Sequence, residues 1–526
     1  MYSLFLRIIF TILFIVSIKV GESQTKQNYS WIVGYGNSNV VKFENSNFLF
    51  QKLFDTLFLP SRNFIPGSNI CNTNGNIILL SNGVSVIDSN KNFVGNLDSI
   101  GGREFVKYNS GDCPYTQYSI FLPLQNNIYY FVNNSVSDSF WAYYNNTGGL
   151  DFNFDELLYC KIDMNGNNGL GICTKREVKL IEKDTLSNTQ MMACRHGNGK
   201  DWWLFKQGSI KNIVHKFLFT QDSVFNFGTQ SFAEPEFSKW DNGGQSMFSQ
   251  DGTKYATTCT GTKKIFVADF NRCSGELSNP LVYDVPPLSA HNTFDSTMVD
   301  VLSEGLAFSP NGRFLYLNMY YNIQQLDLLD SDTSTRWSVV AGLDTTWDAF
   351  NSYSSMYLGP DNKLYVGNWG GLSKQMSYFD TPNIKGVGSG FCPRCLRFPK
   401  VGVTAPPCMP NYDLGALLDN GCDTTKPLPI PIGVDIIIVP NAFTPNGDGK
   451  NDVWHILNLP YLYQEGITIE QVEVYNRWGN KVYSSRDIDF AWNGSGWASD
   501  NYFYFIRYKT KAGMHKIQKG NIVLIR

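Results

Sequence analysis

Short runs of apolar and β-branched residues, each preceded by a turn rich in Asn, Asp and Gly, repeat along most of the chain. Six copies read NTNGNIILL, LQNNIYYFV, HGNGKDWWLF, FSQDGTKYATT, FSPNGRFLYLN and LGPDNKLYVGN. Their second turn residues are Gly75, Asn127, Gly199, Gly252, Gly312 and Asn362, at steps of 52, 72, 53, 60 and 50 residues. Repeats of about this length are typical of solenoids and propellers, so each copy is interpreted as one structural unit.

The turn chemistry predicts that each unit is a small antiparallel sheet. Asn-Gly and Asp-Gly favour positive φ at both central positions of a two-residue hairpin turn, which matches the twist of the flanking strands. A further strand then usually ends in Asp, at Asp88, Asp269, Asp327 and Asp380. Such a sheet cannot bury both faces alone, so neighbouring sheets have to stack radially to form a core.

Residues 24–425 are therefore predicted to form a β-propeller of about seven blades, and six or eight blades also fit. The segment WIVGYGNSNVVKF, which starts at Trp31, is expected to complete the ring as a partial unit. A pair of β-sandwiches is the alternative, because sandwiches also show short strands between regularly spaced turns. The repeated turn-strand-strand-Asp unit favours the propeller, with almost no helix.

A second domain is expected after a proline-rich linker at residues 426–434. Pro427, Pro429 and Pro431 each fix φ and remove a backbone donor, which stiffens the connection. Residues 435–526 contain six or seven short apolar runs separated by turns, which suits a small immunoglobulin-like β-sandwich. The predicted fold class is thus all-β throughout.

Residues 1–23 are predicted to be a secretory signal peptide. Arg7 precedes an uncharged apolar run from Ile8 to Ile18, and cleavage is expected after Ser23. This run is too short to cross about 30 Å of hydrocarbon as a helix, which disfavours the alternative of an uncleaved anchor. We expect no transmembrane segment after cleavage of the leader.

Export changes how the eleven Cys residues are interpreted, because an oxidising compartment favours disulfides and an odd number leaves at least one thiol. Two candidate pairs flank turns: Cys160 with Cys173, and Cys259 with Cys273. A further group consists of Cys392, Cys395, Cys408 and Cys422. This group lacks the second short spacing of a four-Cys zinc ribbon, so disulfides are preferred over zinc.

Composition and charge exclude several classes of protein. The 43 Lys and Arg residues nearly balance the 46 Asp and Glu residues, so the chain lacks the excess of positive charge that is typical of nucleic-acid-binding proteins. A charged content of 17% is too low for a disordered polyelectrolyte. A large globular protein is expected.

No catalytic residues are assigned from the sequence. The five His residues are scattered, and the chain contains neither a GxSxG elbow nor a Walker loop. His196, in HGNGKDWW, is expected to cap a blade turn rather than to act in catalysis. Several aromatic residues are candidates for stacking on sugar rings, although most are expected to pack between blades: Trp202, Trp203, Tyr320, Tyr321, Trp337, Trp347 and Trp369.

One loop, TPNGDGKND, is a candidate calcium site. Asn446, Asp448 and Asp452 present alternating oxygen atoms around glycines, as loops that bind Ca²⁺ do. The loop lacks the first Asp and the last bidentate Glu of an EF-hand, so a turn whose Asx side chains bind their own backbone is the preferred interpretation. No other metal or cofactor is expected.

Four phrases near the C-terminus carry a family resemblance: PNAFTPNGDGKNDVW, VYNRWGNKVY, AWNG and KGNIVLIR. They resemble the gliding motility-associated C-terminal domain, which is the type B sorting domain of the type IX secretion system. The resemblance implies a Bacteroidetes-type exporter, with the type IX machinery as partner and a destination outside the outer membrane. The N-terminal phrases GLAFSPNGRFLY and QSMFSQDGTKYA are similar to WD-repeat-like propellers, which implies no particular activity.

Three functions remain open at this point. The preferred one is a secreted or cell-surface binding protein without catalytic activity, whose extracellular ligand is a glycan or a protein. The alternatives are a polysaccharide lyase or hydrolase that uses the channel mouth, and an adhesin-like component of surface attachment or gliding.

Overall fold

The protein, described here by a computed structural model, forms two compact units, Met1–Ile432 and Gly433–Arg526. The described residues are 26–33, 39–44, 47–51, 67–108, 115–147, 152–209, 212–233, 244–286, 302–319, 322–342, 352–369, 373–402, 405–417, 422, 431–432, 437–459, 462, 466–509, 513 and 515–526. The predicted signal peptide and most of the predicted linker lie outside them. None of the helices in these ranges is long and apolar enough to cross a membrane.

The described part of the first unit contains seven antiparallel sheets in chain order. Two sheets have three strands: β1 (Ser30–Val33), β2 (Asn39–Glu44) and β3 (Asn47–Gln51), then β4 (Ser68–Cys71), β5 (Ile77–Ser81) and β6 (Val86–Asp88). The next two sheets contain β7 (Ser119–Pro123), β8 (Ile128–Ser135), β9 (Glu156–Asp163) and β10 (Ile172–Ile181), then β11 (Leu186–Arg195), β12 (Trp202–Gly208), β13 (Ile213–Phe219) and β14 (Val224–Ser231).

The last three sheets of this unit have four strands each. They contain β15 (Ser246–Phe248), β16 (Lys254–Cys259), β17 (Lys264–Phe270) and β18 (Leu277–Asp284), then β19 (Leu302–Phe308), β20 (Phe314–Met319), β21 (Asn322–Asp327) and β22 (Trp337–Ala341), and finally β23 (Ser352–Leu358), β24 (Leu364–Trp369), β25 (Ser373–Phe379) and β26 (Phe391–Gly402). The short strand β27 (Pro431–Ile432), within the predicted linker, pairs with β14 at the outer edge of its sheet. Pro431 is tolerated there because an edge strand does not need every backbone donor.

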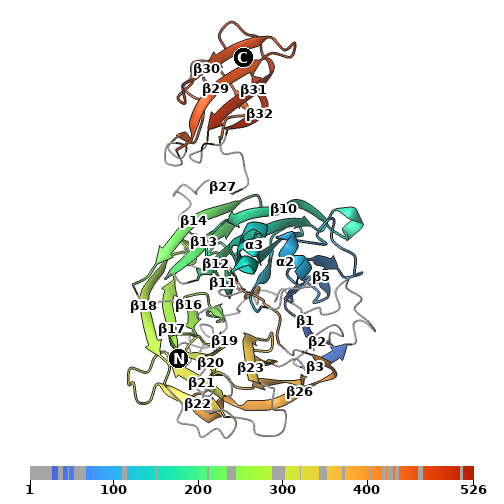
Figure 1. Cartoon of the computed structure of the whole chain (residues 1–526), viewed down its shortest axis with the longest axis vertical. Coiled ribbons are helices and arrows are strands. Elements are labelled where there is room, and N and C mark those ends of the chain that lie inside the picture. The colour runs from blue at the N-terminus through green and yellow to red at the C-terminus, as the bar shows by residue number, and fades with distance from the viewer. Residues whose placement is uncertain are drawn as a thin grey trace, which may run out of the picture. The chain divides into compact units, whose positions relative to one another are not determined.

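The seven sheets surround a central axis as the blades of a β-propeller (Figure 1). The first strands of consecutive sheets, from β1 and β4 to β19 and β23, contact one another around the axis. The ring closes between the first and last sheets, where the rings of Trp31 and Phe43 pack edge-on against Tyr365 at centroid distances of 5.1 and 5.7 Å. The predicted propeller is confirmed, and the segment from Trp31 supplies its first blade.

Burial decreases from the axis towards the outside of each blade. Every residue of β11 and β12 is buried, whereas β14 and β18 are largely exposed beyond their first residues. An inner strand is covered on both faces by neighbouring blades, so it does not alternate between apolar and polar residues. Its buried cations, Arg195 and Lys206, donate to backbone carbonyls.

The six predicted turn residues all adopt positive φ, between 58° at Asn127 and 85° at Gly75. Each lies between the first two strands of its blade, so all six turns lie on one face of the propeller, called the turn face below. Positive φ at two successive positions occurs at Asn126 and Asn127, as predicted, but not at the other five turns. Those turns are wider: Gly252 N donates to Ser249 O at 2.9 Å, and Ser249 Oγ accepts from Lys254 N at 2.9 Å.

Three of the predicted strand-ending Asp residues form ion pairs with a Lys or Arg. This basic residue lies one or two positions after the Gly or Asn of the turn in the same blade. Lys254 Nζ lies 2.7 Å from Asp269, Arg313 Nη2 lies 2.8 Å from Asp327, and Lys363 Nζ lies 2.6 Å from Asp380. In three consecutive blades, each pair joins the start of the second strand to the end of the third strand. The repeat therefore encodes a cross-strand contact as well as a turn.

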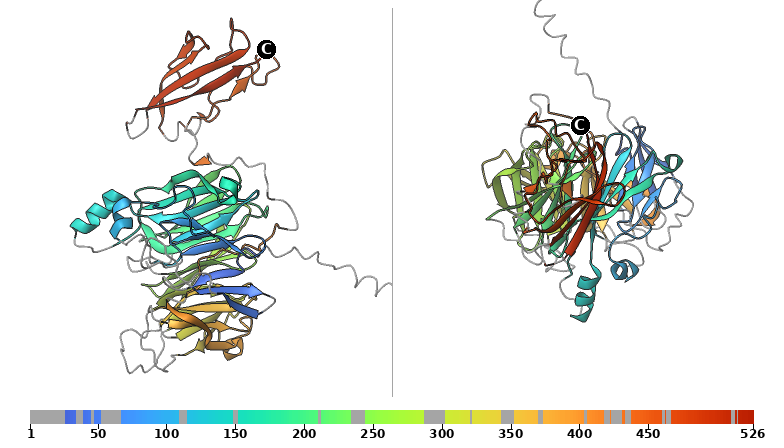
Figure 2. Two further views of the ribbon diagram at one scale, coloured as in Figure 1. Left: turned by 90° about the vertical axis from the view of Figure 1, so that its right-hand side faces the viewer. Right: turned by 90° about the horizontal axis from the view of Figure 1, so that it is seen from above.

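Two short helices depart from the expectation of almost no helix. They are α2 (Arg103–Tyr108), which precedes β7, and α3 (Asp138–Asn146), which joins β8 to β9. Ser137 caps α3 by accepting a hydrogen bond from Phe140 N at 3.1 Å. Strand direction places both helices on the face opposite the turn face, from which they project (Figure 2). Two single 3₁₀ turns are η1 (Asn167–Gly169) and η2 (Gly386–Ser389).

The second unit contains one five-stranded sheet with the strand order β28-β32-β31-β29-β30. The strands are β28 (Ala442–Phe443), β29 (Thr468–Tyr475), β30 (Lys481–Ser485), β31 (Asp500–Lys509) and β32 (His515–Leu524). Tyr502, Tyr504 and Ile506 of β31 are buried, with exposed or half-buried residues between them. Across the core, an isolated β-bridge joins Trp454 to Trp492. The described residues thus form five strands and one bridge, fewer than the six or seven strands predicted.

Candidate functional site

Residues 405–417, called the axial segment below, pass through the centre of the ring (Figure 1). Cys408 N donates to Gly67 O at 3.0 Å, just before β4 begins. Further along, Tyr412 Oη donates to Phe121 O in β7 at 3.1 Å, and Leu417 N donates to Gly197 O beyond the end of β11 at 2.9 Å. Because the first strands of the blades run in the same direction, the axial segment follows the channel to the turn face.

Tyr412 anchors the axial segment in the propeller core. Its side chain is 1% exposed, and its ring packs edge-on against Trp202 at a centroid distance of 5.9 Å. The guanidinium of Arg195 stacks 3.9 Å from the Trp202 ring and donates to Tyr412 O at 3.4 Å. Burial lowers the pKa of Arg195 to about 10, because a dry environment disfavours the charged form.

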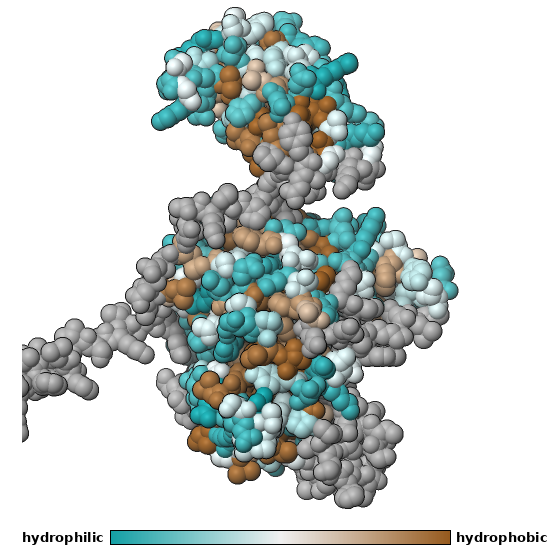
Figure 3. Space-filling model, turned by 90° about the vertical axis from the view of Figure 1, so that its left-hand side faces the viewer, coloured by the Kyte–Doolittle hydropathy of each residue, from teal (hydrophilic) through white to brown (hydrophobic). Residues whose placement is uncertain are grey.

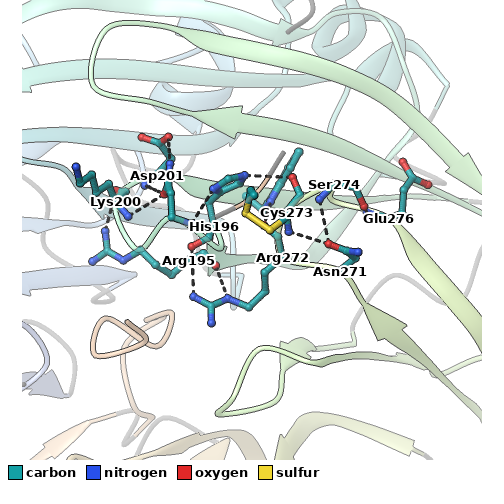
Figure 4. The surroundings of a disulfide bond; sticks show 12 residues. Arg195, His196, Lys200, Asp201, Asn271, Arg272, Cys273, Ser274 and Glu276 are labelled. Atoms are coloured by element: carbon teal, nitrogen blue, oxygen red, sulfur yellow. Dashed lines mark hydrogen bonds between the residues drawn. A yellow bond between two sulfur atoms is a disulfide. The ribbon is translucent and has the colours of Figure 1, made fainter. Parts of the chain in front are cut away.

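A disulfide between Cys273 and Cys422 lies where the axial segment leaves the channel (Figure 4). Beside it, Arg272 donates from Nη2 to Gly415 O of the axial segment and from Nε to Arg195 O at 2.9 Å. Arg272 therefore links the axial segment to the end of β11.

His196 lies beside the same disulfide and has the structural role that its sequence context predicts. Its Nδ1 accepts a hydrogen bond from Asn198 N at 3.1 Å, which leaves Nε2 to donate to Cys273 O at 3.1 Å. Burial lowers the pKa of His196, so the neutral ring is favoured. Both ring nitrogens are used in holding two neighbouring turns together.

A cavity of about 90 Å³ remains between the axial segment and the turn face. Its polar lining consists of Asn28, Ser249, Gln250, Asn362, Asn411 and Asp413. Asp413 is the only carboxylate among the described lining residues, and no His is among them. The thiol of Cys194 also lines the cavity, and burial raises its pKa to about 12, which keeps it protonated. The cavity therefore offers mainly neutral hydrogen-bonding groups.

Two of the aromatic residues considered for a sugar platform are buried in the propeller core. Trp202 and Trp203 are fully buried, and their Nε1 atoms donate to Pro123 O at 2.7 Å and to Arg272 O at 2.8 Å. A stacking role for these two is wrong, because they pack between blades as most of the set was expected to. Tyr320, Tyr321 and Trp347 lie outside the described residues.

In the candidate calcium loop, the oxygen atoms bind the loop's own backbone. Asp452 accepts from Gly447 N at 2.7 Å and from Gly449 N at 2.8 Å, one bond to each carboxylate oxygen. Asn446 Oδ1 accepts from Asp448 N at 3.1 Å, and Asp448 Oδ1 accepts from Lys450 N at 2.8 Å. The three predicted residues are thus brought together, in the arrangement of a self-satisfied Asx turn. Over the described ranges, no three His, Cys, Asp or Glu residues are grouped closely enough to hold a metal ion.

The disulfides differ from the suggested hairpin pairs. Cys273 bonds to Cys422 across 149 residues rather than to Cys259, and Cys160 and Cys173 are both thiols. The second disulfide joins Cys392 to Cys395. Disulfides rather than zinc are therefore confirmed for three members of the C-terminal group, while Cys408 is a buried thiol in the axial segment.

The axial segment was not recognised from the sequence. Its sequence, APPCMPNYDLGAL, has three prolines and no alternation of apolar and polar residues, so it predicts neither strand nor helix. The available signal was its buried-type residues Cys408, Met409 and Tyr412, which are unusual in a solvent-exposed connection. Pairing Cys273 with Cys422 requires knowledge of the ring, because the two lie far apart in sequence.

Comparison with solved structures gives matches to proteins of low identity. A putative 6-phosphogluconolactonase from Bacteroides fragilis is 13% identical, with 73% of this chain and 98% of that chain covered and a TM-score of 0.40. A periplasmic gluconolactonase from Pseudomonas aeruginosa is 12% identical, with 88% and 97% covered and a TM-score of 0.34. A protein from Lactobacillus plantarum is 13% identical, with 87% and 95% covered and a TM-score of 0.34. No curated protein matches the chain.

The second unit matches the model of a known domain family. Residues 437–524 match the CHU_C type IX secretion signal domain, and this range includes all five strands of the unit's sheet. The match agrees with the resemblance of the phrases from Pro440 onwards. The C-terminal unit is therefore a type IX secretion signal domain, and the chain is a propeller protein secreted by the type IX system to the cell surface or the extracellular space.

Proposed function

We propose that the propeller is a non-catalytic binding module that acts outside the cell. The observation that supports this most directly is the axial segment, which occupies the channel that an axial active site would need. The cavity that remains, about 90 Å³, is well below the roughly 300–1,000 Å³ of typical small-molecule sites. We therefore expect a sugar chain or peptide to bind at an outer surface rather than in this cavity.

The α2–α3 projection offers such a surface. Tyr108 and Tyr143 are 72% and 64% exposed. The Tyr108 ring lies 5.0 Å from Trp141, which is buried and packs edge-on against Phe105 at 5.5 Å. Tyr side chains on a rigid base provide contact area at low entropic cost, which suits an extracellular protein or glycan.

Glycan arrays and polysaccharide turnover assays on the purified protein test this proposal. We expect saturable binding to a glycan or a protein without turnover, and weaker binding when Tyr108→Ala and Tyr143→Ala are combined. Leu329→Ala, at a position that is 74% exposed elsewhere on the propeller, is the control and should bind normally. Robust turnover of a polysaccharide by the purified chain would contradict the proposal.

A further inference from the structure

Trp478 is unusually exposed for a residue of its type. It lies in the turn between β29 and β30 and is 81% exposed, whereas Trp454 and Trp492 of the same unit are 0% and 3% exposed. An exposed indole gains nothing for folding from hydrophobic burial. The indole is therefore available to a binding partner.

Hydrogen bonds order the backbone of the turn that carries Trp478. Asn476 Oδ1 accepts hydrogen bonds from Trp478 N at 3.0 Å and from Asn480 N at 2.9 Å. Asn476 N also donates to Asn480 O at 2.9 Å, and Gly479 adopts φ of 78°, which only glycine does readily. A partner that binds the indole would pay little conformational entropy to order this turn.

Arg477 is also fixed in place. Its guanidinium forms a two-pronged pair with Asp500, with Nε 2.7 Å from Oδ2 and Nη2 in contact with Oδ1. This pair connects the turn to the start of β31. A second large side chain of a type enriched at binding hot spots thus lies next to Trp478.

The adjoining end of the sheet is partly apolar. Tyr475, the last residue of β29, pairs with Phe503 of β31, and its ring packs edge-on against Phe505 at 5.7 Å. Phe503 and Val523 are 46% and 37% exposed. Figure 3 shows exposed apolar atoms on the C-terminal unit.

We infer that Trp478 and its neighbours Tyr475, Arg477 and Phe503 form the surface by which a protein of the type IX secretion machinery recognises this domain. The four residues lie inside the range that matches the secretion signal domain, whose role requires recognition by a protein. Trp, Tyr and Arg are the residue types most enriched among the hot spots that dominate protein–protein binding energy. The inference rests on the export route and is independent of what the propeller binds.

Secretion of the full chain by a host that has a type IX system tests the inference. Trp478→Ala should lower the external fraction at least several-fold and leave folded protein in the periplasm, because hot-spot truncations weaken binding roughly tenfold or more. Trp478→Phe should restore most of the secretion. Leu457→Ala, at a position that is 54% exposed in the same unit, is the matched control and should be secreted normally.

Thermal unfolding of the periplasmic protein and photo-crosslinking complete the experiment. A photoreactive phenylalanine at position 478 should crosslink to a component of the outer-membrane secretion complex. Normal secretion of the Trp478→Ala protein, a lowered unfolding midpoint, or crosslinking only to the chain's own propeller would each overturn the inference. Normal secretion after deletion of residues 435–526 would instead show that the export route itself is wrong.

Discussion

At the turn that follows β11, His196 occupies the place that Ser249 and Ser309 occupy in two later blades. In each case the backbone carbonyl accepts a hydrogen bond from the Gly three residues later, at 2.9 Å. Each side chain also offers an acceptor atom to the backbone of its own turn: Nδ1 in His196 and Oγ in the two Ser residues. His196 is therefore a turn-capping residue that differs from the others in being able to titrate.

This difference predicts a pH dependence for the stability of the propeller. Burial lowers the pKa of His196, so the unfolded chain takes up a proton at higher pH than the folded chain does. The stabilisation of the fold by neutral His196 is complete above about pH 6.5 and is lost as the pH falls towards the pKa of His196 in the folded protein. Asn72, three residues before Gly75, shows that Asn can cap such a turn, because its Oδ1 accepts a hydrogen bond from Asn74 N. We therefore expect His196→Asn to reduce the fall in the unfolding midpoint between pH 7 and pH 5.

The measurement is thermal unfolding of wild-type and His196→Asn protein at both pH values. Carboxylates titrate in both proteins, so the difference between the two pH profiles isolates the histidine. Identical profiles would contradict the assigned role.

Asp452 shows how one side chain organises the candidate calcium loop. Both of its oxygens already accept backbone hydrogen bonds, so replacement by Asn leaves one of the two glycine amides with a poorer partner. Asp452→Asn should therefore destabilise the C-terminal unit by about 1 kcal/mol. Chelator or added calcium should leave the unfolding midpoint of the wild-type protein unchanged. A midpoint that rises with calcium in wild-type protein but not in Asp452→Asn would establish a cation site instead.

Among the elements, the axial segment depends on a long-range covalent bond. The Cys273–Cys422 disulfide closes a loop with a sequence separation of 149 residues, whereas Cys392–Cys395 spans a separation of 3. A disulfide that closes a long loop removes more conformational freedom from the unfolded chain. The two disulfides are thus expected to contribute very differently to stability.

Replacing both Cys273 and Cys422 by Ser should destabilise the propeller by about 2–5 kcal/mol and increase protease cleavage within residues 405–417. The matched control replaces Cys392 and Cys395 by Ser and should have a much smaller effect. Denaturant unfolding and limited proteolysis, with and without reductant, provide the readout. Equal losses in the two variants would show that the long loop is not the cause.

The elements that were predicted well are those with local signals. Gly199, Gly252 and Gly312 identify their hairpins because positive φ is a local requirement, and the apolar runs after them identify inner strands. The axial segment and the Cys273–Cys422 bond were missed because they depend on contacts between distant blades. Tyr412, for example, meets Trp202 and Phe121 only after the ring has closed. The helices α2 and α3 were missed because both are very short.

For the molecule as a whole, export and the proposed binding function are assigned to different units. The propeller core and the C-terminal sheet are separate compact bodies with their own buried residues, so each has the means to fold by itself. The export signal lies in the second body and the proposed binding surface in the first. The two activities are therefore expected to be separable by changes to one unit at a time.

Deletion of residues 435–526 tests that separation. The shortened chain keeps all seven blades, the axial segment and both disulfides, so the propeller should fold and melt as it does in the full protein. Without the secretion signal domain it should accumulate in the periplasm rather than outside the cell. Cell fractionation followed by thermal unfolding of the retained protein provides the measurement, with the full chain as control. If the shortened propeller reached the medium in normal amounts, export through the C-terminal unit would be wrong. If it failed to fold, the division into independent units would be wrong.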